Sequence, residues 1–143
     1  MKKNSYLCVT NTTKLMRTQF IDFLASRGAS NVDFRDDKVT FSLNGLNYIF
    51  VYNESDRHYF RLILPNISPS ITEENPRHEQ IINEINRDYK VAKAFVVNDR
   101  IWISVEQFVY SNENINFLFD RCISLLPRII DQVRRILNSE SND

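Results

Sequence analysis

Residues 39–52, VTFSLNGLNYIFVY, decide the fold of this chain, because an Asn-Gly pair stands between two strand-like runs. A two-residue type I′ turn needs positive φ at both central positions, and Asn44-Gly45 tolerates it. The turn sets the register of a hairpin that pairs Leu43 with Leu46, Phe41 with Tyr48 and Val39 with Phe50. One face then carries Val39, Phe41, Leu43, Leu46, Tyr48, Phe50 and Tyr52, and we expect it to belong to the core.

A second hairpin is predicted over residues 94–104, AFVVNDRIWIS, with a two-residue turn at Asn98-Asp99. Its register pairs Val97 with Arg100, Phe95 with Trp102 and Lys93 with Ser104. One face is fully apolar and consists of Ala94, Val96, Ile101, Ile103 and Val105. The other face is mixed and carries Lys93, Phe95, Val97, Arg100, Trp102, Ser104 and Glu106.

Periodicity and stop signals predict the other elements. Apolar residues recur at three- and four-residue steps over residues 13–27, and Gly28 follows as a helix stop. Residues 32–52 and 58–64 predict four strands in antiparallel sequence. Asn75 can cap a second helix and Pro76 can begin it. We expect Ile82, Ile85 and Tyr89 to share one side of that helix.

A third helix is predicted from about residue 114 to 137. Its apolar stripe consists of Ile115, Leu118, Phe119, Cys122, Leu126, Ile129, Ile130, Val133, Ile136 and Leu137. Pro127 lies inside this stripe, where a proline removes a hydrogen bond and costs about 3 kcal/mol or more, so we expect a kink or a break near Leu125. The predicted fold class is therefore α+β: one domain over residues 1–143, ordered over about 13–137, with an antiparallel sheet and three helical segments in the order α-β-β-β-β-α-β-β-α.

Charge and cysteine usage narrow the possible partners and compartments. The chain has 18 Lys and Arg against 18 Asp and Glu, so no net field draws it to nucleic acid or to an anionic membrane. Its first residues, MKKNSYLCVTN, contain too short an apolar run for a signal peptide, and no run of about 18 apolar residues suits a membrane span. Cys8 and Cys122 form no disulfide framework, which favours a reducing compartment, and we expect a cytoplasmic protein.

Motifs for catalysis, metals and cofactors are missing from the sequence. His58 and His78 have no Cys or carboxylate at ligand spacing, and two glycines are too few for a phosphate-cradling loop. Asn83 and Asn86 stand near the end of a helix, where asparagine more often bonds backbone than forms a site. We therefore expect no catalytic residue, no metal and no cofactor.

The mixed face is the candidate site. Across both hairpins and the strand between them, it gathers seven apolar residues: Ile49, Val51, Tyr59, Ile63, Phe95, Val97 and Trp102. Burying each contributes roughly 1.5 to 3 kcal/mol, so something should cover this face. The cover is either one of the three helices or a partner, which can be a second copy or another protein. Charged residues such as Arg61 and Glu106 interleave with the apolar ones, as in an interface that is soluble alone.

The element order and the segment INEINRDYKVAKAFVVNDRIWISVEQF, residues 82–108, resemble the YbjN family and, more distantly, the fold of type III secretion chaperones. The resemblance covers residues 77–137 best. Asn83, Asn86 and the turn Asn98-Asp99 match the family's helix end and short polar turn. This resemblance implies a small bacterial α+β domain, commonly dimeric, that binds other proteins and has no catalytic residues to carry over.

The sequence thus favours a non-enzymatic protein-binding or regulatory module, similar to a chaperone or adaptor and forming a homodimer. The alternative is a small-ligand-binding protein or an enzyme with a pocket between sheet and helices. That pocket would use Tyr48, Tyr52 or His58.

Overall fold

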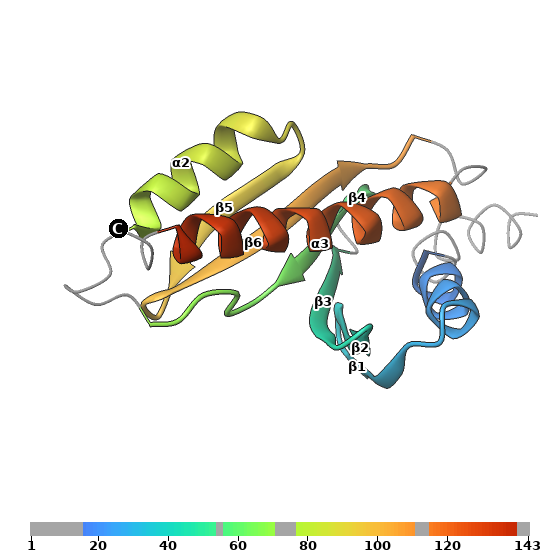
Figure 1. Ribbon diagram of the computed structural model, residues 1–143. Coiled ribbons are helices and arrows are strands. Elements are labelled where there is room, and N and C mark those ends of the chain that lie inside the picture. Colours follow the sequence, from blue (N-terminus) through green and yellow to red (C-terminus); the bar gives the residue numbers. More distant parts are fainter. Residues whose placement is uncertain (1–15, 54–55, 71–76, 111–114, 140–143) are drawn as a thin grey trace, which may run out of the picture.

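The computed structural model describes residues 16–53, 56–70, 77–110 and 115–139, which form one six-stranded antiparallel sheet and three helices (Figure 1). The strands are β1 Ser30–Arg35, β2 Lys38–Leu43, β3 Leu46–Asn53, β4 Asp56–Leu64, β5 Ala92–Val97 and β6 Arg100–Phe108. A helix over residues 16–26 precedes them, and the other helices are α2 His78–Asp88 and α3 Ile115–Asn138. The sheet order is β1-β2-β3-β4-β6-β5, and the predicted fold class and element order are confirmed.

Both hairpins have the predicted registers. Val39 pairs with Phe50 across the first turn, and Phe95 pairs with Trp102 across the second. The first turn has φ of 51° at Asn44 and 81° at Gly45, and the second has φ of 48° at Asn98 and 64° at Asp99. These left-handed conformations match the twist of the flanking strands. The two turns therefore determine which residues share each face of the sheet.

The helix over residues 16–26 ends at Gly28, as predicted. Gly28 has φ of +73° and its N–H donates to the carbonyl of Ala25 at 3.3 Å, while the Ala29 N–H donates to Leu24 at 3.1 Å. This pair of bonds is the Schellman arrangement, which satisfies carbonyls at a helix C-terminus. The chain then turns directly into β1, so this helix packs beside the first hairpin (Figure 1).

Helix α3 runs from Ile115 to Asn138 as one element across the sheet, and Pro127 lies inside it without breaking it (Figure 1). Of the kink or break expected near Leu125, the break is therefore wrong. The cost of the lost hydrogen bond is local, whereas Leu126 and Ile129 on either side of the proline are both fully buried. Packing on the sheet holds the two halves in one helix. Ile123, which the periodicity did not include, is buried with the stripe.

Helix α2 lies along the edge strand β5. Ile81 and Ile85 are its buried residues, while Ile82 and Tyr89 only partly pack against the core. The predicted stripe thus lacked Ile81. The predicted start at Asn75 and Pro76 lies outside the described residues.

The core forms between the helices and one face of the sheet. Its centre is aromatic: Phe20 stacks on Phe50 with ring centroids 3.8 Å apart, and the ring of Phe119 meets the ring of Phe20 edge-on at 4.9 Å. Buried residues of all three helices belong to this single cluster, together with the predicted core faces of both hairpins. Leu46 and Val96 are the exceptions. Both lie near hairpin turns, where Leu46 stays partly exposed and Val96 stays exposed.

Candidate functional site

The mixed face carries all seven predicted residues, because the observed registers place them on the side of the sheet opposite the core. Ile49 pairs with Ile63, Val51 with Arg61, and Phe95 with Trp102. Six of the seven are half-buried, and only Ile63 is buried, at 6% exposure. Ile63 lies outside the core cluster although it is buried, which shows that the two faces of the sheet are separate apolar surfaces.

No helix among the described residues covers the mixed face. The helix over residues 16–26, α2 and α3 all bury their apolar stripes in the one core cluster on the other side of the sheet. The interpretation that one of the three helices lies across the mixed face is therefore wrong. All three stripes are needed to bury the continuous aromatic and aliphatic core face, so none remains for the opposite face.

Aromatic side chains gather at both ends of the mixed face. At one end the rings of Phe95 and Trp102 have centroids 6.4 Å apart, and Trp102 Nε1 donates to Asn66 Oδ1 at 3.0 Å. At the other end Tyr59 lies opposite Phe108, with ring centroids 5.8 Å apart. The indole is thus held in one orientation while its ring remains partly accessible.

Sequence reasoning missed two aromatic residues that extend this surface. Phe108 is 56% exposed and Tyr110 is 89% exposed, and their ring centroids are 6.4 Å apart. Phe108 continues the alternation of Trp102, Ser104 and Glu106 along β6, so the period-2 pattern could have included it. Tyr110 follows the strand and had no such signal.

Charged side chains occupy the middle of the mixed face, between the two aromatic ends. Arg61 Nε lies 3.4 Å from Glu106 Oε1, and Lys93 Nζ lies 3.4 Å from Glu106 Oε2. Arg61 also donates to Ser104 Oγ at 3.4 Å. Ser104 is completely buried. One acidic and two basic groups thus form a compact cluster with both signs.

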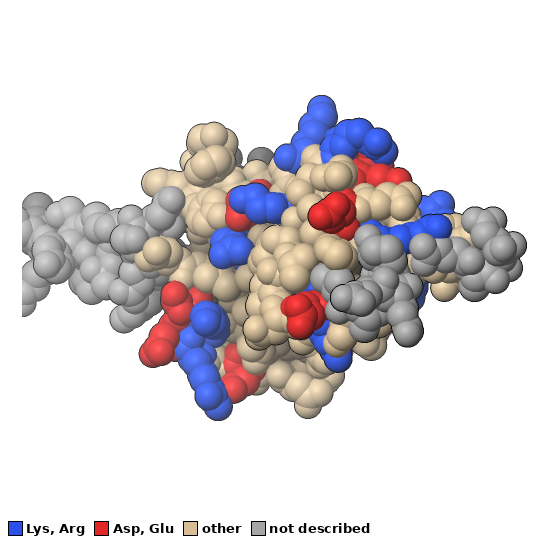
Figure 2. Space-filling view, turned by 90° about the vertical axis from the view of Figure 1, so that its left-hand side faces the viewer, with Lys and Arg blue, Asp and Glu red and all other residues tan. Residues whose placement is uncertain are grey.

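The wider surface also mixes the two signs. Figure 2 shows one side of the molecule, where basic and acidic side chains lie next to one another rather than in a field of one sign. This agrees with the equal numbers of basic and acidic residues in the chain. Electrostatic complementarity here depends on individual pairs and not on net charge.

The mixed face is hollowed beside Ile49. A cavity of about 320 Å³ lies next to β2 and β3 and is lined by Asn31, Thr40, Phe41, Ser42, Asn47, Tyr48, Ile49 and Pro65. Ser42 donates to Asn47 at 2.7 Å on its floor. Such a hollow can accept a side chain from a partner.

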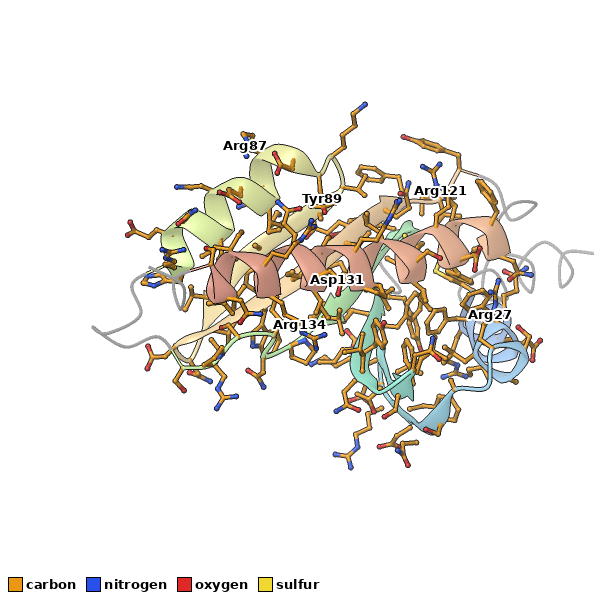
Figure 3. All side chains as sticks on the ribbon, in the orientation of Figure 1. Arg27, Arg87, Tyr89, Arg121, Asp131 and Arg134 are labelled. Atoms are coloured by element: carbon orange, nitrogen blue, oxygen red, sulfur yellow. The ribbon has the colours of Figure 1, made fainter. Side chains whose placement is uncertain are left out.

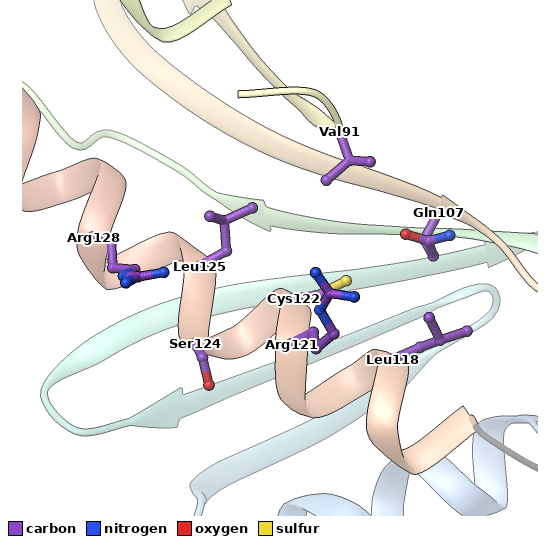
Figure 4. Close-up of a pocket in the computed structure, with 8 residues that line it drawn as sticks. All are labelled: Val91, Gln107, Leu118, Arg121, Cys122, Ser124, Leu125 and Arg128. Atoms are coloured by element: carbon purple, nitrogen blue, oxygen red, sulfur yellow. The ribbon is translucent and has the colours of Figure 1, made fainter. Parts of the chain in front are cut away.

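A second cavity, of about 330 Å³, lies beside α3 on the opposite side of the sheet (Figure 4). Leu118, Cys122 and Leu125 of α3 face Val91 and Gln107 across it. Arg121 and Arg128 line it from positions two turns apart on α3, and neither forms an ion pair within the part of the chain that the structure describes. Figure 3 shows Arg121 near the start of α3. Chemically, this groove suits a ligand with an apolar body and an anionic group.

The structure does not bring together Tyr48, Tyr52 and His58, the residues proposed for a pocket between sheet and helices. The hydroxyl of Tyr52 donates to the Asp36 carbonyl at 3.1 Å, and His58 Nδ1 lies 3.1 Å from the Val109 carbonyl. Tyr48 lines a cavity of about 320 Å³ between sheet and helices. Burial raises the pKa of Tyr48 to about 12, so its hydroxyl stays protonated at neutral pH.

The described residues contain no group of three or more His, Cys, Asp and Glu side chains that could hold a metal ion. Cys122 is buried among apolar residues, and this burial raises the pKa of its thiol to about 11. Asn86 bonds backbone, as expected, through two hydrogen bonds to Ala94. Within the same residues, no helix has the length and apolar character that crossing a membrane requires.

Comparison of the chain with models of known families, with curated proteins and with solved structures gives no match.

Proposed function

We propose that this protein is a non-enzymatic protein-binding or regulatory module, of a chaperone or adaptor type, that forms a homodimer through the mixed face. The resemblance to the YbjN family suggests the same role and a bacterial cytoplasm. The single observation that carries the proposal is that the mixed face has seven apolar residues, most of them partly exposed, and that no described helix covers it.

The composition of the mixed face supports binding of a protein rather than of a small molecule. Trp, Tyr, Phe and Arg are the residues most enriched in protein interfaces, and the face contains Trp102, Tyr59, Phe95 and Arg61. The polar groups in its middle, Arg61, Lys93, Ser104 and Glu106, are paired with each other, so they keep the separate subunit soluble. Covering the apolar residues would add favourable burial without leaving these polar groups unsatisfied.

The test is the molar mass in solution, measured by light scattering over a hundredfold range of concentration for the wild type and for Trp102→Glu. We expect a wild-type dimer, and a monomeric variant that keeps its circular dichroism spectrum, because a charge at this position cannot be desolvated. Phe117→Glu is the matched control. Phe117 is 60% exposed but lies on α3, away from the mixed face, so this variant should dimerise like the wild type.

Two results would contradict the proposal. A wild type that stays monomeric over the whole range would show that the mixed face does not bind a second copy. A Trp102→Glu variant that still dimerises would place the interface elsewhere on the molecule.

A second candidate function is small-ligand binding, and the groove beside α3 favours it. Arg121 and Arg128 offer charge for an anionic group above the apolar floor at Leu118 and Leu125. Isothermal titration calorimetry with decanoate, which measures its binding to the protein, tests this function. Binding that is lost in Arg121→Gln/Arg128→Gln but kept in Arg134→Gln/Arg135→Gln would support it, since the latter pair does not line the groove.

A further inference from the structure

We infer the geometry of the homodimer: two copies pack mixed face to mixed face about a two-fold axis that runs between β4 and β6, along the strands. Arg61 of each copy then meets Glu106 of the other. This inference rests on the proposed function and specifies how the two copies are arranged.

The symmetry of facing sheets limits where the axis can lie. A two-fold axis that brings the same face of two sheets together must lie in the plane of the interface. If it runs along the strands between β4 and β6, it places β4 of one copy over β6 of the other. Residues that pair across β4 and β6 within one chain then lie over each other between the chains. Aligned sheets pack this way with a crossing of about 30°.

The observed register makes this arrangement complementary. Arg61 pairs with Glu106 across β4 and β6, so each copy presents one basic and one acidic group at mirrored positions beside the axis. The same two-fold rotation places Tyr59 of one copy over Phe108 of the other, which forms an aromatic contact between the copies. Ile63 lies over Ser104, whose hydroxyl accepts a hydrogen bond from Arg61 within its own chain.

The remaining charge of the central cluster also fits this axis. Lys93 pairs with Ser104, and Ser104 pairs with Ile63, which pairs with Ile49, so all four lie in one row across the sheet. The two-fold rotation therefore brings Lys93 of one copy over Ile49 of the other and not over another cation. Its aliphatic stem can cover Ile49 while its ammonium group stays near Glu106, 3.4 Å away.

An axis perpendicular to the strands is less favourable. If it crossed the middle of the same cluster, it would place Arg61 of one copy directly over Ile63 of the other. The guanidinium would then lose water against an aliphatic side chain without a facing carboxylate, which carries a desolvation cost. The axis along the strands avoids this cost at Arg61, because the guanidinium then faces Glu106 of the other copy.

Charge reversal with mixing tests the arrangement. Arg61→Glu leaves two carboxylates at positions 61 and 106, and Glu106→Arg leaves two guanidinium groups there. Each variant alone should dimerise at least tenfold more weakly than the wild type, because like charges then face each other across the axis. An equimolar mixture should form a heterodimer, and the double variant Arg61→Glu/Glu106→Arg should form a homodimer again.

The matched control is Arg87→Glu. Arg87 forms an exposed pair with Asp88 at the end of α2, with 2.8 Å between Arg87 Nε and Asp88 Oδ1, and α2 packs on the core side of the sheet. Its reversal therefore changes net charge equally without touching the mixed face. Sedimentation velocity of each variant and of the mixture gives the dissociation constants. Circular dichroism should show that every variant remains folded.

The outcomes separate this inference from the proposed function. If Trp102→Glu gives a monomer but the mixture of Arg61→Glu and Glu106→Arg does not associate, the mixed face is the interface and the axis lies elsewhere. If the two single variants dimerise as strongly as the wild type, the proposed position of the axis is also wrong. If the wild type is monomeric at every concentration, the proposed dimer itself is wrong.

Discussion

Asn86 shows how one side chain can join a helix to the sheet. Its Oδ1 accepts from the Ala94 N–H at 2.7 Å and its Nδ2 donates to the Ala94 carbonyl at 3.3 Å. Ala94 lies on β5, the edge strand, whose outward backbone groups would otherwise lack a partner. We expect Asn86→Ala to lower the free energy of unfolding by about 1 to 2 kcal/mol, measured by urea denaturation.

Asn83 provides the control for this prediction. It lies on the same helix and is exposed, so Asn83→Ala should change stability by about 0.5 kcal/mol or less. Equal effects of the two substitutions would mean that the link to Ala94 adds no stability beyond the general effect of Asn→Ala in this helix.

Tyr48 makes stability depend on pH in alkaline solution. Burial raises its pKa from 10 to about 12, so the folded chain keeps a proton that the unfolded chain loses first. The unfolded state then binds fewer protons, and stability falls as pH rises from 10 to 12, by at most about 1.4 kcal/mol per pH unit. Urea denaturation of the wild type and of Tyr48→Phe should show a shallower decline in the variant. Tyr110→Phe, which removes an exposed hydroxyl, should decline like the wild type.

At the scale of elements, Pro127 leads to a prediction about helix α3. The helix runs unbroken through this residue, so it lacks one backbone hydrogen bond in its interior. We expect Pro127→Ala to restore that bond and to raise the free energy of unfolding by about 1 to 3 kcal/mol, with a higher melting temperature in calorimetry. A loss of stability would instead mean that the proline shapes the helix for its packing on the sheet.

The sequence was most informative where a local rule has one solution. Positive φ at Asn44 and Gly45, and at Asn98 and Asp99, set two registers that the structure confirms pair by pair. It was less informative where long-range packing decides. Pro127 on its own predicts a kink or a break, but buried residues on both sides of it keep α3 a single helix. The cover of the mixed face could not be predicted either, because an apolar stripe on a helix does not say which face of the sheet it packs against.

At the scale of the molecule, the fold has two layers. Three helices bury one face of the sheet, and the described residues leave the other face without a helix (Figure 1). Sheets in such folds commonly keep a polar outer face. Here the outer face keeps Phe95, Trp102, Tyr59 and Phe108 instead, which separates the residues that fold the chain from those available for binding.

This separation predicts that thermal stability depends on protein concentration. If a second copy covers the mixed face only in the folded state, dissociation and unfolding are linked, and a hundredfold rise in concentration should raise the melting temperature by a few degrees. Trp102→Glu should remove this dependence while Phe117→Glu keeps it, because only the first lies on the mixed face. Differential scanning calorimetry at several concentrations gives the result. A wild-type melting temperature that is constant over the range would show that the mixed face stays uncovered and contributes nothing to stability through self-association.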